Sequence, residues 1–342
     1  MKKTVTLDQD VFAGAFRAGE TITYDARIPT SDDGVGFVLS QFTMLEPRWY
    51  AAKYPGIEFA ELVDVNTEGG EAMDEVAWRM YDGVTMGKFI GATADDLPRV
   101  ALTAKLFKAP IGYAGNEFEY SLDEIRKASA VGLPLDSTLA SFARRGAEEH
   151  TQRVVYFGDA ERGMTGLFNN PNVPTSNSTL DWFDPATTPL DIVADVNDAI
   201  NEVYATTKGV SFPNRLVLSA NRWAFISTTY ASAQYPDKSI LDLIREKNVY
   251  KAKTGRDLEI FSRFQLEQEE LAKEIPGYTG GDIMLVYEKT PENLETHIPM
   301  PWRPIAPQPR GLKVVVPCEY KASGVQWRYP LSAVYRTMVK RT

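Results

Sequence analysis

The feature that most constrains this chain is the stretch 118–171, in which two helix patterns follow one another and end in a tight apolar corner. Ser121 and Glu124 have the spacing of a capping box, in which each side chain satisfies the other residue's backbone N–H at a helix start. Gly132 and Pro134 then interrupt the pattern, because glycine loosens the backbone and proline is tolerated only in a helix's first turn. The sequence therefore predicts a short helix from Ser121 and a second helix from about Pro134.

The second helix is predicted to be long and amphipathic, with charged side chains gathered opposite an apolar face. The apolar face repeats at steps of three and four residues and comprises Leu135, Leu139, Phe142, Gly146, His150, Val154 and Phe157. At 1.5 Å per residue this helix would be about 36 Å long. Burying its apolar side chains does not offset the entropy lost in ordering it, so the rest of the chain must pack on it.

Composition places the chain among soluble globular proteins. Of its 342 residues, 44% are hydrophobic and 24% are charged, which is ordinary for two or three compact units. Apolar runs stay short of the eighteen or so residues of a membrane span, and no signal-peptide core follows the basic N-terminus. The single cysteine, Cys318, excludes an internal disulfide and a multi-cysteine zinc site, and it suits a reducing cytoplasm.

The net charge of −9 bears on nucleic-acid binding. It argues against a protein whose main task is to grip a phosphate backbone, because that affinity comes from lysine and arginine side chains that release counterions. A protein that surrounds nucleic acid without adhering to it is compatible with this charge.

The N-terminal part reads as short elements. Residues 1–34 have no sustained period and predict an extended arm. Residues 37–52 approximate helical spacing, and residues 57–65 alternate as a strand does.

Residues 66–115 predict a long hairpin. Turn formers such as Gly69-Gly70 and Asp82-Gly83 accompany two strand-like runs, 75–81 and 100–113. A two-stranded hairpin is marginal alone in water and needs a surface to lie on. If the hairpin projects from the body, a neighbouring copy of the chain would offer that surface.

A compact α/β unit is expected after the corner and a polar loop at 172–188. A helix opens at Thr188-Pro189 and stops at Gly209, and strands then alternate with helices. The strand candidates are 215–220, 258–262 and 282–289, and the helix candidates are 221–232, 238–248 and 265–273.

The end of the chain combines prolines and strands. Six prolines between Pro291 and Pro309 predict a connector without regular structure. Three strand-like runs follow, at 312–320, 325–330 and 333–339. We expect these runs to form the sheet on which the long helix packs, which would make that domain discontinuous in sequence.

Several motifs together resemble a known family. They are FEYSLDEI at 118–125, the helix pattern over Gly132–Phe157, FGD at 157–159, GLFNNP at 166–171 and the closing run YKASGVQWRYPLSAVYRTMV at 320–339. In these the chain resembles the tailed-bacteriophage major capsid proteins with the Hong Kong 97-type fold, which bacterial encapsulin nanocompartments share. The resemblance covers nearly the whole chain in layout. It implies an α+β fold with a long spine helix on a sheet, a projecting E-loop hairpin and an α/β axial domain.

The resemblance also implies domain boundaries and a function. The implied segments are the N-terminal arm and the segment leading into the fold (1–65), the E-loop (66–117), the peripheral domain with the spine helix (118–172), the axial domain (173–310) and the strands returning to the peripheral domain (311–342). The implied function is that of a structural protein, not an enzyme, which forms hexamers and pentamers of an icosahedral shell around double-stranded DNA. By analogy, the E-loop lies over the neighbouring subunit and axial domains meet at capsomer centres.

The implied partners are further copies of the chain, a scaffolding protein, a portal and, for some relatives, a decoration protein. DNA would be enclosed without sequence-specific binding, no membrane would be involved, and the virion capsid would assemble in the bacterial host cytoplasm. Because only a short arm follows Met1, we expect the scaffold to be a separate protein. Some relatives crosslink an E-loop lysine to a neighbour's asparagine. Lys88 and Lys105 are available here, but we interpret both as solvated surface lysines.

Two patterns suggest ligand binding, and each has a simpler interpretation. Residues 83–89 resemble a phosphate-binding loop, but the spacing is one residue short and Phe89 replaces the Ser or Thr that would hold magnesium. We interpret them as a hairpin turn. Glu148, Glu149 and His150 could supply metal ligands, but no matching cluster accompanies them, and a packed or interfacial histidine is preferred.

Cys318 and His297 could form a thiolate and its base, which requires hydrogen-bond contact and a third orienting group. Cys318 lies in an apolar run, so a buried, inert cysteine is preferred. We therefore assign no catalytic, cofactor-binding or metal residue and expect no cofactor.

Three functional hypotheses follow in order of preference. The first is a viral major capsid protein, and the alternative is an encapsulin-like shell that encloses cargo enzymes instead of DNA. The third is a hydrolase or transferase in the α/β unit, for which the sequence nominates no residue.

Overall fold

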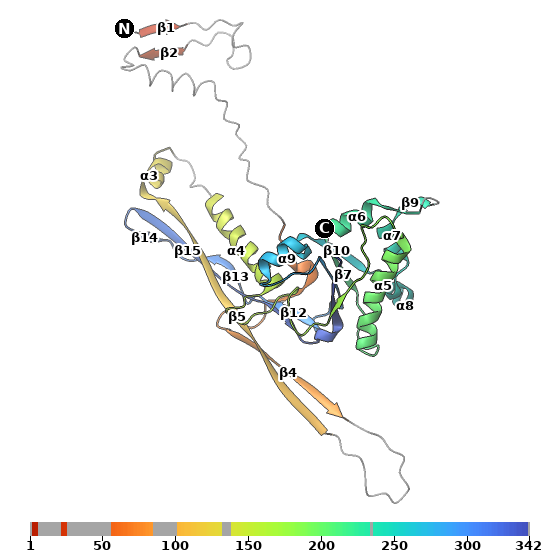
Figure 1. The fold of residues 1–342 in the computed structure, drawn as a ribbon. Helices are drawn as coiled ribbons and strands as arrows, with labels where there is room; N and C mark the ends of the chain where they lie inside the picture. Colours follow the sequence, from red (N-terminus) through yellow and green to blue (C-terminus); the bar gives the residue numbers. More distant parts are fainter. Residues whose placement is uncertain are drawn as a thin grey trace, which may run out of the picture. The chain divides into compact units, whose positions relative to one another are not determined.

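The computed structural model describes residues 2–5, 22–25, 56–84, 101–131, 138–232 and 235–340 (Figure 1). The chain divides into two compact units, residues 1–56 and residues 57–342. In the first unit, β1 (Lys2–Val5) pairs antiparallel with β2 (Ile22–Asp25). The rest of the expected arm and the helix expected at 37–52 lie outside the described residues. All other described elements belong to the second unit.

The longest strand of the second unit, β5 (Ala101–Ser121), changes partner halfway along its length. Its first half pairs antiparallel with β4 (Glu75–Val84). Its second half pairs antiparallel, across its other edge, with β15 (Lys313–Ser323). The β4–β5 ribbon therefore extends away from the sheet that contains β15, as Figure 1 shows. The predicted hairpin with strands at 75–81 and 100–113 is confirmed.

Both helices of the central stretch form. The helix α3 (Leu122–Val131) opens with the predicted capping box, since Ser121 N–H donates to Glu124 at 2.9 Å and Glu124 N–H donates to Ser121 Oγ at 3.1 Å. The helix α4 (Thr138–Phe157) has 20 residues, which makes it about 30 Å long. Its predicted start at Pro134 lies outside the described residues.

The chain folds back on α4 directly after its last residue. Gly158 has φ +71°, and a Cβ there would collide with the backbone of the returning turn, so only glycine fits. The N–H groups of Leu167 and Phe168 donate to the carbonyls of Val155 and Tyr156 at 2.9 and 3.0 Å. The predicted apolar corner therefore packs on the helix end as part of the core.

The helix α4 lies against β5 and β15, which confirms that it packs on a strand more than 150 residues later in the chain. Asn116 of β5 donates to the carbonyl of Ala143, and Tyr320 of β15 shares a 2.9 Å hydrogen bond with His150 Nδ1. These side-chain bonds fix the helix on the sheet at two places.

Burial of α4 changes along its length. Near its C-terminus, Val154 and Phe157 are buried, together with residues on other sides of the helix. Nearer its N-terminus, Leu139 and Phe142 are 41% and 42% exposed. The predicted apolar face is therefore only partly covered, because the corner and the central sheet meet only the C-terminal turns.

A five-stranded sheet in the order β10-β7-β11-β17-β6 divides the hydrophobic core in two. Its strands are β6 (Thr175–Asn177), β7 (Arg215–Ser219), β10 (Glu259–Arg263), β11 (Ile283–Tyr287) and β17 (Ala333–Thr337). Side chains alternate between the two faces of a strand. In β7, accordingly, Leu216 faces one part of the core and Val217 the other.

Helices cover both faces of this sheet. One face packs on a helical layer formed by α5 (Pro189–Thr206), α6 (Ala220–Thr228), α7 (Ile240–Glu246) and α8 (Val249–Thr254). The opposite face packs on the end of α4 and on α9 (Gln268–Glu274). The expected α/β unit is thus present, with its first helix capped at Thr188 and its strands where the sequence predicted them.

Three details of this sheet region differ from the prediction. The last strand, β17, does not return to the sheet beneath α4 but pairs with β11 and β6, because both of its faces are apolar and require an interior position. The strand β6 lies within the expected polar loop. The helix expected at 221–232 ends at Thr228, and β8 (Tyr230–Ser232) then pairs with β9 (Tyr235–Ser239).

The proline-containing segment 291–309 is not irregular, so that prediction is wrong. It contains β12 (Leu294–His297), the centre of the three-stranded sheet β16-β12-β3, and then β13 (Met300–Pro304) and β14 (Gln308–Arg310), which pair with β15. The other two strands of that sheet are β3 (Asp64–Asn66) and β16 (Val325–Trp327), so β16, like β17, does not join the sheet beneath α4, contrary to the prediction. The prolines lie outside β12 and on the outer strands, where no partner requires their N–H.

The strand predicted at 57–65 is wrong over its first half, where α2 (Phe59–Leu62) forms before β3. Glu58 and Glu61 both pair with the buried guanidinium of Arg263, at 3.1 and 2.6 Å. Two carboxylates three residues apart reach one cation when the backbone is helical. This tertiary contact overrides the strand that the alternating apolar pattern predicts.

The link between β5 and α4 yields a stability prediction. Asn116→Leu should leave the Ala143 carbonyl without its donor and Trp302 Nε1–H, now 3.0 Å from Asn116 Oδ1, without its acceptor. We expect the free energy of unfolding of the subunit to fall by about 1–3 kcal/mol in denaturant titrations. The exposed neighbour Glu117 provides the control, and Glu117→Gln should change it by less than about 0.5 kcal/mol. Equal losses of unfolding free energy in the two variants would contradict a role of Asn116 in holding α4 on the sheet.

The hydrogen bond between α4 and β15 yields a pH prediction. Partial burial, and next the nearby Arg153, lower the pKa of His150 below its ordinary value, so the folded subunit favours neutral His150. The unfolded chain then binds more protons as the pH falls through about 6.5, and stability decreases in that direction. His150→Gln keeps an acceptor for Tyr320 without titrating. Between pH 7.5 and pH 5, chemical unfolding should show a larger loss for wild type than for the variant, and equal losses would refute this.

Candidate assembly surfaces

The polar residues of α4 that could have formed a metal site are engaged elsewhere. Glu148 and Glu149 each form a 2.8 Å salt bridge with an arginine one turn earlier, and His150 bonds to Tyr320. Throughout the part of the chain that the structure describes, no group of three or more His, Cys, Asp or Glu side chains is arranged to hold a metal ion.

The structure gives Cys318 and His297 different partners. Cys318 is buried in β15, where burial raises the pKa of its thiol and Sγ lies 3.7 Å from the carbonyl of Val316. His297 is buried in β12, with Nδ1 2.9 Å from Gln326 and Nε2 3.2 Å from Glu295. This arrangement is that of a core cysteine and a hydrogen-bonded core histidine.

The remaining candidates lie on the hairpin. Lys88 and most of the loop 83–89 fall between β4 and β5, outside the described residues. Lys105 is an exposed residue of β5, opposite Met80. Among the described residues, the other distinctive features are exposed apolar surfaces.

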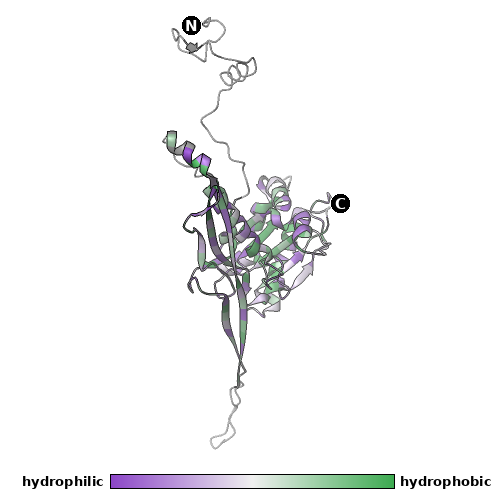
Figure 2. Ribbon diagram, turned by 90° about the vertical axis from the view of Figure 1, so that its left-hand side faces the viewer, coloured by the Kyte–Doolittle hydropathy of each residue, from purple (hydrophilic) through white to green (hydrophobic). Residues whose placement is uncertain are grey.

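One face of the ribbon carries an apolar stripe. Tyr81 of β4 and Leu102 and Leu106 of β5 project from the same face, since Tyr81 lies opposite Ala104, midway between the two leucines. They are 58%, 67% and 59% exposed. Figure 2 shows hydrophobic residues alternating with hydrophilic ones along this ribbon. A second exposed apolar surface is the N-terminal half of α4, with Leu139 and Phe142.

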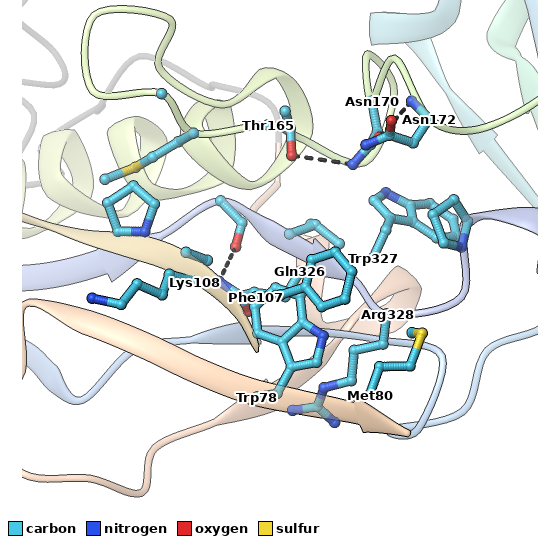
Figure 3. A pocket seen from close by; sticks show the side chains of 17 residues that line it. Trp78, Met80, Phe107, Lys108, Thr165, Asn170, Asn172, Gln326, Trp327 and Arg328 are labelled. Atoms are coloured by element: carbon cyan, nitrogen blue, oxygen red, sulfur yellow. Dashed lines mark hydrogen bonds between the residues drawn. The ribbon is translucent and has the colours of Figure 1, made fainter. Parts of the chain in front are cut away.

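The other face of the ribbon, at its root, lines a pocket of about 460 Å³ (Figure 3). Trp78 and Phe107 are a cross-strand pair whose rings stack with centroids 5.8 Å apart. The opposite wall comes from the turn after α4 and from β16 with the residues that flank it. The apolar lining includes Trp78, Met80, Phe107, Met164, Trp327 and Pro330.

Two buried donors of this pocket have no acceptor among the described residues. Trp78 Nε1–H is one and Arg328 Nε–H is the other. The other two guanidinium nitrogens of Arg328 donate to the carbonyl of Pro291, at 2.9 Å, and to the carboxylate of Glu295. Because an unbonded buried donor is costly, the pocket is suited to a group that brings an acceptor oxygen.

No local sequence pattern predicts this pocket. Its walls come from residues more than 200 positions apart, such as Trp78 and Trp327, and no local pattern connects them. The only available signal was that aromatic residues stand on both predicted strands of the hairpin, which would place some of them on a solvent face.

No helix in the described ranges is both long and apolar enough to cross a membrane.

Comparison with known proteins identifies the fold. The capsid of Myoviridae phage XM1 superposes with a TM-score of 0.71 at 14% identity, covering 92% of this chain and 100% of that chain. A structure from Gordonia phage Cozz gives 0.58 at 12% identity, covering 93% and 98%. The capsid of an empty GTA particle gives 0.54 at 10% identity, covering 91% and 98%. The fold is therefore the Hong Kong 97-type capsid fold expected from the sequence.

A search among curated proteins finds no match to this chain. The family model described as major capsid protein matches residues 86–339, well over half of the sequence. The chain therefore belongs to the major capsid protein family, as a structural protein of phage virions that associates with copies of itself into a shell.

Proposed function

We propose that this protein forms the hexamers and pentamers of an icosahedral shell that encloses the double-stranded DNA of a tailed phage. The observation that carries the proposal is the β4–β5 ribbon, which exposes apolar side chains to water in a single subunit. Covering these side chains with another protein surface would be favourable. Membership of the capsid family makes a neighbouring copy the natural cover.

The segments of the subunit then receive roles. The region 66–117 acts as the E-loop, 118–172 as the peripheral domain with α4 as its spine, and 173–310 as the axial domain at capsomer centres. The arm 1–65 leads into the fold, and 311–342 returns through β15 to the peripheral domain while β17 completes the axial sheet. In this arrangement the protein has no catalytic task.

The proposed partners beyond further copies rest on the family resemblance. They are a separate scaffolding protein, a portal and, in some particles, a decoration protein, with assembly in the bacterial host cytoplasm. The net charge of −9 supports a shell that encloses DNA without sequence-specific contacts.

Expression tests the proposed function directly. The protein, produced alone or together with a scaffolding protein, should give capsomers, shells or tubes in negative-stain micrographs. A strictly monodisperse monomer at high concentration would contradict the proposal. Shells that form without scaffold and copurify with an enzyme would instead identify an encapsulin-like compartment.

The apolar stripe yields a mutational prediction. Leu102→Ser combined with Leu106→Ser should leave the thermal unfolding of unassembled subunits almost unchanged, because both side chains are exposed there. Assembly should weaken by about 2–5 kcal/mol per subunit, the gain from burying two leucines, measured as a raised critical concentration in light scattering. Lys105→Ser is the control and should assemble as wild type does, because Lys105 is exposed on the opposite face of the same strand and does not line the pocket there. If the double serine variant assembled as readily as the control and the wild type, the stripe would not be an interface.

A further inference from the structure

The chain contains a segment with unusual exposure and composition. Residues 303–310 are all exposed and include Pro304, Pro307 and Pro309. They belong to β13, β14 and the link between them, on the outer side of β15. The spacing of Pro304 and Pro307 is that of a Pro-x-x-Pro sequence, which favours an extended backbone at low entropic cost.

The pocket at the root of the ribbon has the chemistry that such segments bind. Proline-rich segments dock in grooves lined by aromatic side chains. Trp78, Phe107 and Trp327 provide aromatic walls, and Pro330 adds a further apolar surface. Proline offers a carbonyl without an N–H, so the segment presents more acceptors than donors. Trp78 Nε1–H is a buried donor without an acceptor, so a docked carbonyl that displaces the atoms covering it would supply one.

One subunit cannot bring its own segment to its own pocket. Pro304 lies opposite Cys318, and Cys318 lies opposite Asn116 of β5. Phe107, at the pocket, is nine residues from Asn116 along the same continuous strand. At about 3.3 Å per residue the two places are about 30 Å apart. If this segment fills such a pocket, it must therefore come from a second copy.

We propose that the segment Pro304–Pro309 of one copy docks in the Trp78–Phe107–Trp327 pocket of its neighbour. This inference rests on the proposed self-assembly and specifies one of its contacts. The contact joins different patches of two copies and is therefore heterologous, the type that builds rings when its rotation closes. The pocket and the apolar stripe lie on opposite faces of the ribbon, so a copy could use both at once.

The first test uses unassembled full-length protein and a synthetic peptide, RPIAPQPR, corresponding to residues 303–310. Addition of the peptide should shift the indole N–H signal of Trp78 in NMR spectra, assigned by its absence in Trp78→Phe. The control peptide carries alanine in place of all three prolines. No shift at millimolar peptide, or the same shift with the control peptide, would overturn the proposal.

The second test uses assembled particles. Asn172 lines the pocket and is exposed, as is Ile305 in the segment. Under mild oxidation, Asn172→Cys with Ile305→Cys should produce a ladder of covalently linked subunits on non-reducing gels. Tyr81→Cys with Ile305→Cys, on the opposite face of the ribbon, should not. Shells without a ladder would refute the docking but leave the proposed function standing, whereas wild-type protein that forms no particles would refute the proposed function.

The third test separates docking from folding. Trp78→Phe removes an unbonded N–H, so unassembled subunits should unfold as wild type does or at slightly higher denaturant. Their critical concentration for assembly should rise at least about fivefold, the equivalent of one lost hydrogen bond. Trp302→Phe is the matched control, because its N–H is bonded to Asn116 inside the subunit and its loss should destabilise folding. Unchanged assembly of Trp78→Phe would count against the proposal.

Discussion

The ladder between β5 and β15 is the contact on which the rest of the structure depends. Eleven residue pairs, from Ile111 opposite Ser323 to Ser121 opposite Lys313, hold the second half of β5 in the body of the unit. Because the strand is continuous, this ladder also sets the direction of its first half, which carries β4 outward. A slip by one residue would turn every side chain to the other face. The ladder therefore decides that Trp78 and Phe107 face the pocket while Leu102 and Leu106 face solvent.

Burial is distributed unevenly, and the uneven distribution has a functional meaning. The centre is closed: the five-stranded sheet is buried between two apolar clusters, and Tyr335 Oη donates to the carbonyl of Leu167 to join the sheet to the corner after α4. The ribbon and the first turns of α4 contribute little to this core. Elements with few buried contacts open most easily in an isolated subunit. They are also the elements free to meet a neighbour, so assembly would stabilise the parts that folding leaves weakest.

Local sequence signals predicted the elements that depend on local chemistry. The capping box at Ser121, the helix start at Thr188-Pro189, the strand runs of the hairpin and the sheet strands from 215 onward all formed as expected, because caps and periodicity act within a few residues. The errors arose where distant partners decided the outcome. Arg263 imposed a helix on 59–62, and β15 gave β13 and β14 a ladder despite their prolines. The pocket was not predictable, since its walls meet only after β4 and β16 are placed.

The unbonded N–H of Trp78 differs in kind from the unbonded nitrogens of the buried arginines, and among the described residues only the buried hydroxyls of Tyr156 and Ser176 share its complete lack of a partner. Arg215, Arg263 and Arg336 each leave nitrogen atoms unbonded, but each guanidinium also forms a salt bridge, and a group with five donors can satisfy only some of them. Trp78 has one side-chain donor, so its deficit is complete. Folded proteins rarely retain such a group without a reason. In a subunit whose function lies in meeting its copies, the simplest reason is that the acceptor belongs to the next subunit.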